Sequence, residues 1–181
     1  MVATCDVEIA EYVESIGGRA VLTSSDHERA TNRVAEAVNV LEADGGGCVD
    51  IVAMVQGDEP LVGPESLRRV VECMSDPDVQ IANLVYPTSN PEEIVDPNNV
   101  KVVIDRLKNA LYFSRAAIPA SMNSSNVFSA LIQTGVFAFR REALLLFNEL
   151  EESNLEKIES IDMNRVLEHG GRIRTVLSDI P

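Results

Sequence analysis

The chain has 181 residues, of which 45% are apolar, so it is long enough to build the core of one ordinary domain. Its 15 Lys and Arg residues against 29 Asp and Glu residues give a formal net charge of −14, the wrong sign for a surface that follows a nucleic-acid backbone. No apolar run approaches the roughly 20 residues that would span a bilayer, and no basic-plus-apolar leader opens the sequence. We therefore expect a cytoplasmic protein without nucleic-acid or membrane partners. Cys5, Cys48 and Cys73 lack the spacing of a metal site, which predicts reduced, mostly buried thiols.

Strand and helix patterns alternate along the first half of the chain. The expected elements are the end of a strand at 2–4, a helix at 6–16, a strand at 20–23, a helix around 34–41, a strand beginning at 49, a helix at 64–74 and a strand at 79–86. In the second half they are a helical turn at 90–93, a β-hairpin at 100–104 and 110–114, a mobile Ser/Asn-rich loop at 120–129, a strand at 131–139, helices at 141–150 and 155–168, and a strand at 173–177. This order predicts a single α/β domain over residues 1–181 without an internal repeat.

The most informative stretch is the apolar run that begins at Val49 and stops abruptly at Gln-Gly-Asp-Glu-Pro, residues 56–60. Such a run is typical of a buried parallel strand. Gly57 and Pro60 predict a tight loop at its carboxyl end, where open α/β sheets bind ligands. Asp58 would be a hard oxygen ligand for a metal ion at that point. The alternative is a turn aspartate that only caps the following helix.

Five short motifs occur in one order along the chain, namely Asp26-His27, Gln56-Gly57-Asp58-Glu59-Pro60, Val100-Lys101-Val102-Val103, Ala110-Leu-Tyr-Phe-Ser-Arg115 and Ile158-Glu-Ser-Ile-Asp162. This order resembles the 3-deoxy-manno-octulosonate (Kdo) cytidylyltransferases, also called CMP-Kdo synthetases, over essentially the whole chain. The resemblance implies a three-layer fold like that of the nucleotide-diphospho-sugar transferases, with a mixed, mainly parallel sheet and a β-hairpin insertion. It also implies a homodimeric, Mg²⁺-dependent nucleotidyltransferase of lipopolysaccharide or surface polysaccharide synthesis. Such an enzyme joins CTP to an acidic sugar and releases pyrophosphate.

The resemblance also assigns a nucleotide-binding loop. It places four residues in the loop that closes over the cytosine and ribose of CTP, namely Asp26, His27, Thr31 and Arg33. Arg29 and Ala30 stand where the family usually has Ser and Gly, so they add a charge and a β-carbon where backbone is expected to approach the base. The alternatives are a solvated loop side chain for His27 and a helix-surface charge for Arg33.

Three further residues match the chemical centre of the family. The resemblance makes Asp58 the magnesium-binding aspartate and Gln56 a contact to the sugar acid. Arg115 matches an arginine that pairs with the substrate carboxylate, for which a planar, permanently charged guanidinium is suited. We therefore predict that Asp58 and Arg115 are catalytic. The alternative for Arg115 is a surface arginine at the end of a strand.

Four positions on the sugar side depart from the family pattern. Gln133 and Phe137 stand where the Kdo enzymes usually carry His and Tyr, and Asp162 and Met163 stand where they carry Glu and Gln. The changes at Gln133 and Met163 favour another acidic sugar, such as 8-amino-Kdo, whose amine the Gln133 carbonyl and the Asp162 carboxylate could hold. The alternative is drift within the core, because Phe and Met side chains more often pack than contact a ligand.

Two parts of the family pattern have no counterpart in this chain. They are an opening strand with its cationic triphosphate-binding loop, and a Val-Asp-Thr-Pro-Glu-Asp segment after the last strand. We therefore expect a truncated domain that lacks both ends and a central strand of its sheet, and that is inactive alone. The rival from another class is a non-catalytic remnant that folds and binds a partner. A covalent nucleophile is not expected, because no Ser or Cys lies in an elbow motif.

Overall fold

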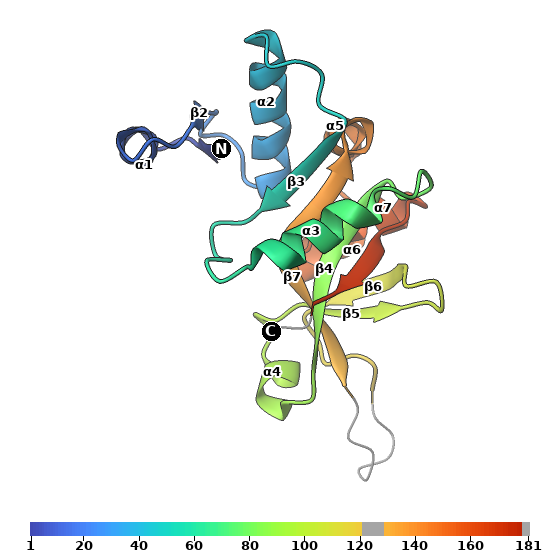
Figure 1. Cartoon of the computed structure of the whole chain (residues 1–181). Coiled ribbons are helices and arrows are strands. Elements are labelled where there is room, and N and C mark those ends of the chain that lie inside the picture. Colours follow the sequence, from blue (N-terminus) through green and yellow to red (C-terminus); the bar gives the residue numbers. More distant parts are fainter. Residues whose placement is uncertain (121–128, 179–181) are drawn as a thin grey trace.

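A central mixed sheet with helices on both faces organises the structure (Figure 1), a computed structural model that describes residues 1–120 and 129–178. In chain order the elements are β1 (Val2–Thr4), α1 (Val7–Ser15), β2 (Ala20–Leu22), α2 (Ala30–Ala43), β3 (Ile51–Val55), α3 (Pro64–Cys73), β4 (Ile81–Thr88), α4 (Pro91–Val95), β5 (Lys101–Ile104), β6 (Ala110–Ser114), β7 (Ala130–Arg140), α5 (Arg141–Glu149), α6 (Asn154–Glu159), α7 (Met163–Glu168) and β8 (Arg174–Leu177). The expected Ser/Asn-rich loop lies mostly outside the described residues.

The long strand β7 is the centre of the main sheet. Strand β4 pairs with one edge of β7 along nearly its whole length. Strands β3 and β5 share the opposite edge, β3 at residues 136–140 and β5 at residues 131–132. Strand β8 continues the sheet beyond β4, and β6 continues it beyond β5. Residues 133–135 therefore lie where β3 and β5 separate, and this division creates the mouth of the site described below.

The expected α/β fold with a mixed sheet is confirmed, but the description of that sheet as mainly parallel is wrong. Among the described ladders of the main sheet, one is parallel (β4–β8) and four are antiparallel. The β5–β6 hairpin reverses the chain, so β7 runs opposite to both β3 and β4. The parallel pairing expected for β3 is corrected for the same reason. Strand β3 also alternates between buried and exposed residues instead of being buried throughout.

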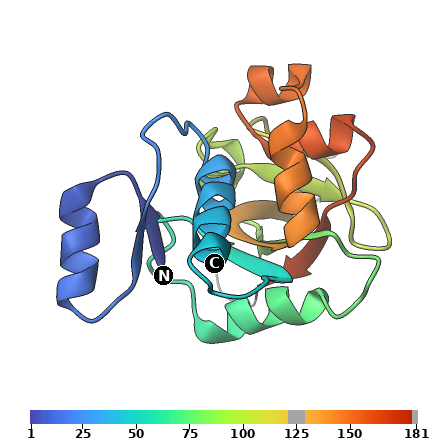
Figure 2. The same cartoon turned by 90° about the horizontal axis from the view of Figure 1, so that it is seen from above.

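Helices cover the main sheet in two layers (Figure 2). Helix α3 lies on one face, where Val70 and Met74 pack against Leu84 and Ala138. Helices α2, α5 and α7 lie on the other face, where the side chains of Phe137 and Phe139 stack at 5.8 Å. Neighbouring residues of β4 and β7 enter opposite cores, because side chains alternate along a strand. No described helix is long and apolar enough to cross a membrane.

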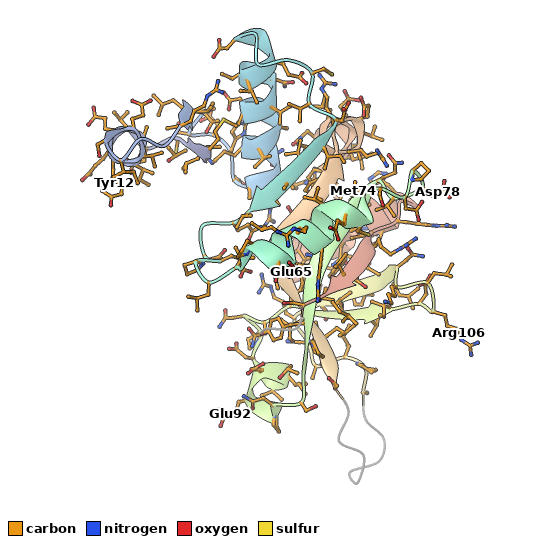
Figure 3. The ribbon with its side chains drawn as sticks, in the orientation of Figure 1. Tyr12, Glu65, Met74, Asp78, Glu92 and Arg106 are labelled. Carbon is orange, nitrogen blue, oxygen red and sulfur yellow. The ribbon has the colours of Figure 1, made fainter. Side chains whose placement is uncertain are left out.

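Strands β1 and β2 form a separate two-stranded parallel sheet with α1 beside it. In the described structure this arm makes no ladder with the main sheet. Figure 3 shows Tyr12 of α1 pointing away from the main sheet, and its side chain is 65% exposed. Cys5 on the arm and Cys48 before β3 are also exposed, so the expectation of mostly buried thiols is wrong for both.

The expected last helix at 155–168 is broken into α6 and α7. Ser160 adopts a left-handed backbone conformation with φ of 53°, and the Ile161 N–H donates to the Glu156 carbonyl at 3.2 Å. A left-handed residue ends a helix because the next residues can no longer follow its axis. The break turns residues 160–162 towards the site.

Candidate active site

A cavity of about 1120 Å³ opens between α2, the end of β3 and the middle of β7. This volume slightly exceeds the roughly 300–1,000 Å³ typical of small-molecule sites, so a nucleotide and a sugar could share it. Seven of the predicted site residues line the cavity: His27, Arg33, Gln56, Asp58, Arg115, Gln133 and Asp162. They come from five segments that are far apart in the sequence. Asp26, by contrast, is exposed and does not line the cavity.

The loop after β3 carries Gln56 and Asp58. The Gln56 N–H donates to the Gly135 carbonyl of β7 at 3.0 Å, and the Glu59 N–H donates to the Gln56 carbonyl at 3.1 Å, which closes a tight turn. Asp58 is exposed on this turn and faces the cavity. No three His, Cys, Asp or Glu side chains gather into a metal cage within residues 1–120 and 129–178. Since Mg²⁺ is commonly held by one or two carboxylates together with substrate phosphates, Asp58 fits a site for a magnesium–nucleotide complex.

The loop before α2 is held by two residues of that helix. Arg33 donates to the Thr23 hydroxyl at 2.6 Å and to the Ser24 carbonyl at 3.1 Å. Glu36, which the sequence reading missed, accepts from the Ser24 N–H at 2.8 Å and lies 2.5 Å from His27 Nε2. The hydrogen bond from the Ser24 backbone, followed by that from His27, lowers the pKa of Glu36. Arg33 and Glu36 lie three residues apart on one face of α2, so both can reach the loop before it.

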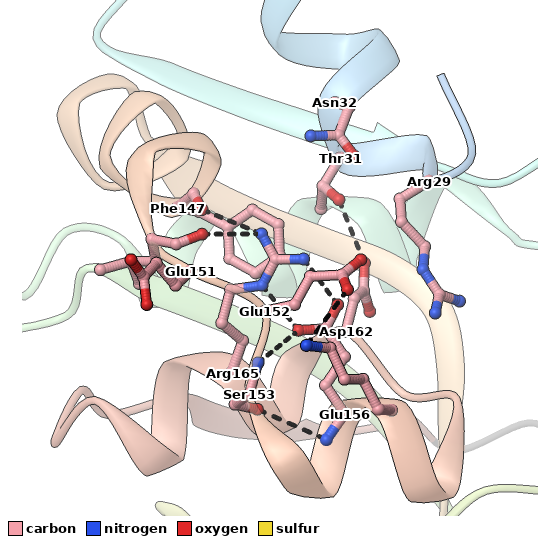
Figure 4. A network of polar contacts seen from close by, with 12 residues as sticks. Arg29, Thr31, Asn32, Phe147, Glu151, Glu152, Ser153, Glu156, Asp162 and Arg165 are labelled. Carbon is pink, nitrogen blue, oxygen red and sulfur yellow. Dashed lines mark hydrogen bonds and ion pairs between the residues drawn. The ribbon is translucent and has the colours of Figure 1, made fainter. Parts of the chain in front are cut away.

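Thr31, at the start of α2, joins this helix to the α6–α7 turn. It is fully buried, and its hydroxyl donates to Asp162 Oδ2 at 3.1 Å across 131 residues of sequence. Figure 4 shows Thr31 pointing at Asp162 from α2. Burial raises the pKa of the Asp162 carboxyl, against the opposing effects of Thr31 and Arg29. Thr31 therefore positions a wall of the cavity without facing it.

A buried ion pair supports the same turn (Figure 4). Arg165 donates from two nitrogens to the two carboxylate oxygens of Glu156 at 2.7 and 2.6 Å. The Arg165 guanidinium also lies 4.5 Å from the centre of the Phe147 ring. Both charged side chains are at most 6% exposed, so each charge compensates the other for the loss of contact with water.

Arg115 ties two walls of the cavity together. Its guanidinium donates to the carbonyls of Pro97, Glu159 and Ser160 at 2.8, 2.7 and 3.3 Å. A guanidinium has five N–H groups, so two of them are not engaged in these three bonds. The pairing of Arg115 with a substrate carboxylate stays a prediction, and the structure adds a role in joining the loop before β5 to the α6–α7 turn.

Glu159 holds the end of β6, a role that the sequence reading missed. Its carboxylate accepts from the Tyr112 hydroxyl at 2.8 Å, the Ser114 hydroxyl at 2.7 Å and the Arg115 N–H at 2.9 Å. Burial by itself would raise the pKa of Glu159, but these hydrogen bonds and the Arg115 charge outweigh it, so the pKa is lowered.

Lys101 is fully buried, and its ammonium donates to three backbone carbonyls. The acceptors are Asp96, Asn99 and Arg115, at 2.8, 2.5 and 2.6 Å. Burial lowers the pKa of this ammonium. Asn99 and Arg115 both line the cavity, so Lys101 fixes its rim from inside. A lone Lys in the apolar run Val-Lys-Val-Val was the available signal, since a buried ammonium needs partners.

Comparison with known proteins identifies the family of this chain. The family model described as cytidylyltransferase matches residues 1–173. This chain belongs to the cytidylyltransferase family. The 3-deoxy-manno-octulosonate cytidylyltransferase of Syntrophus aciditrophicus is 44% identical over 97% of this chain and 70% of its own length. The corresponding enzyme of Syntrophobacter fumaroxidans is 41% identical over 99% of this chain and 72% of its own.

A solved structure shows the same fold. The CMP:2-keto-3-deoxy-manno-octonic acid synthetase complexed with CTP matches with a TM-score of 0.86 and 33% identity. The match covers 96% of this chain and 69% of that one. The three-layer arrangement expected from the sequence is therefore confirmed for this cytidylyltransferase.

The four departures on the sugar side separate into two pairs. Gln133 and Asp162 line the cavity of this cytidylyltransferase. Phe137 and Met163 are 1% and 0% exposed, belong to the core shared with α5 and α7, and do not line it. In the structure these two side chains act as packing residues, and any contact with substrate stays a prediction.

Proposed function

We propose that this cytidylyltransferase activates an acidic sugar of the Kdo type with CTP, giving a CMP-sugar and pyrophosphate. The observation that carries the proposal is that Gln56 and Asp58 on the loop after β3 and Arg115 after β6 line one cavity, although about 57 residues of sequence separate the two segments. Membership of the family and the 44% identity to a Kdo cytidylyltransferase support the same reaction. The cavity has room for a nucleotide beside a sugar acid.

In this reaction the anomeric hydroxyl oxygen of the sugar forms a bond to the α-phosphorus of CTP, the bond from that phosphorus to pyrophosphate breaks, and the hydroxyl proton is released. The protein's contribution is to position and to neutralise, because the reacting groups supply the covalent chemistry themselves. Asp58 would hold Mg²⁺ bound to the nucleotide phosphates, and the ion would stabilise the charge that develops on pyrophosphate. We assign His27 and Arg33 to the nucleotide side and Gln56 to the sugar acid.

Arg115 completes the sugar side in this proposal. Two of its N–H groups are not used by the three carbonyl bonds, and a carboxylate could accept them. The resemblance of the sequence also supports a homodimer in the cytoplasm that takes part in lipopolysaccharide or surface polysaccharide synthesis. We include both in the proposal.

A second candidate is the same reaction on an acidic sugar that carries an amine, such as 8-amino-Kdo. The observation that favours it is the side-chain oxygen of Gln133, which is buried and has no hydrogen-bond partner among the described residues. A buried acceptor without a donor costs roughly 1–3 kcal/mol, so a ligand that donates to it would be favoured. Asp162 lines the same cavity and supplies a second acceptor.

The experiment combines binding with product analysis. The protein is titrated calorimetrically with CTP and with Kdo, and then incubated with CTP, Mg²⁺ and an equal mixture of Kdo and 8-amino-Kdo. We expect both CTP and a sugar acid to bind, and any product to have the mass of a CMP-sugar. If CTP or the sugar acid does not bind, the proposal is refuted. A tenfold preference for plain Kdo would refute the second candidate alone.

A further inference from the structure

A β-bulge in the middle of β7 lies where β3 and β5 separate. The pairing of β4 with β7 passes from Asn83 opposite Phe137 to Val85 opposite Gln133. Leu84 alone therefore faces the three residues 134–136. Bulges redirect backbone groups and are common beside functional sites. Thr134 and Gly135, which form this bulge, line the cavity.

Side chains satisfy the backbone groups that the regular ladder would have paired. Asn83 is fully buried, and its amide donates to the Thr134 and Val136 carbonyls, both at 3.1 Å. The Thr134 hydroxyl donates to the Leu84 carbonyl at 2.8 Å and accepts from the Val136 N–H at 3.2 Å. These hydrogen bonds fix the bulge. The backbone N–H and carbonyl of Gly135 are left free to face the edge of β7 that lies opposite β4.

The loop after β3 binds to these two groups. The Gly135 carbonyl accepts from the Gln56 N–H at 3.0 Å, and the Gly135 N–H donates to Glu59 Oε1 at 2.5 Å. The Gln56 side chain occupies the space beside Gly135. A Cβ added there would lie 2.8 Å from Gln56 Cβ and 2.9 Å from Gln56 Oε1, so any larger residue would displace Gln56.

We propose that Glu59 and Gly135 are positioning residues that fix the loop carrying Gln56 and Asp58 against β7. The proposal rests on the proposed function, because Gln56 is taken to contact the sugar acid. Glu59 holds one end of the turn through its carboxylate, and Gly135 keeps the space for the Gln56 side chain. A purely structural bulge would change stability without changing ligand affinity in the folded protein.

The test uses Glu59→Ala, Glu59→Gln and Gly135→Ala, with Glu149→Ala as a control at an exposed glutamate outside the cavity. Amide hydrogen exchange at Gln56 and Gly135 is followed by NMR, and binding of Kdo and of metal-free CMP by calorimetry. Glu59→Ala should reduce amide protection and Kdo affinity about tenfold, the effect of one lost hydrogen bond. Gly135→Ala should reduce both to a similar extent, because the added Cβ displaces the Gln56 side chain.

Glu59→Gln keeps an acceptor oxygen and should stay within about threefold of the wild type, and CMP affinity should not change in any variant. Unchanged exchange in Glu59→Ala, or reduced protection with full Kdo affinity, would overturn the proposal. So would equal defects in Glu59→Ala and Glu59→Gln. If the wild type binds no Kdo, the proposed function fails, while the exchange data still decide whether Glu59 and Gly135 fix the loop.

Discussion

Replacing Lys101 by methionine should destabilise the protein more than any exposed lysine substitution. The change keeps the approximate volume but removes an ammonium that donates to three backbone carbonyls at 2.8, 2.5 and 2.6 Å. Each carbonyl left without its donor costs about 1–3 kcal/mol, so the three together set an upper limit of roughly 9 kcal/mol. Removing the buried charge recovers several kcal/mol of desolvation free energy. We expect a net loss of about 2–4 kcal/mol in the free energy of unfolding.

Urea unfolding followed by circular dichroism measures this loss directly. For a domain of this size, a loss of about 2–4 kcal/mol should lower Tm by roughly 4–16 °C. Lys157→Met is the matched control, because Lys157 is 58% exposed and its ion pair with Glu152 spans 3.8 Å. The control should change stability by less than about 0.5 kcal/mol. If Lys101→Met costs no more than the control, the buried ammonium does not hold the rim of the cavity.

Three further predictions concern acidic side chains. Asp58→Asn should raise the Kd of magnesium–CTP at least tenfold, while the Kd of metal-free CMP stays constant. If calorimetry shows that the affinities for both ligands fall equally, Asp58 does not bind the metal ion. Folding lowers the pKa of Glu159. The ionised Glu159 carboxylate therefore stabilises the folded protein fully above the unfolded-state pKa, and this contribution is lost as the pH falls through the folded-state pKa. Glu159→Gln should therefore flatten the decline in stability on acidification from about pH 5 downwards, and urea titrations that show an unchanged pH profile would argue against this. Glu156→Ala should lower the free energy of unfolding by about 3–5 kcal/mol, because it leaves the Arg165 charge buried without a partner. The double variant Glu156→Leu with Arg165→Met should lower it much less. Equal losses in urea unfolding would show that the unpaired charge is not the cause.

Local signals in the sequence determined most of the elements. Asp6 caps α1 with its side chain, Asn90 caps α4 in the same way, and Pro64 occupies the first turn of α3. These signals act within a few residues, so they can be read without knowing the partners in space. Gly57 and Pro60 likewise indicated that Gln56 and Asp58 lie on a loop after β3.

The tertiary structure decided which strands pair and which polar groups meet. The antiparallel partner of β3 lies 81 to 89 residues further along the chain, and the apolar run at 49–55, which is typical of a parallel strand, does not fix the direction of that partner. Ser160 breaks the expected last helix although no Gly or Pro marks the place. The contact between Thr31 and Asp162 spans 131 residues. Such contacts depend on how the packed layers bring distant segments together, and local propensity carries no information about that.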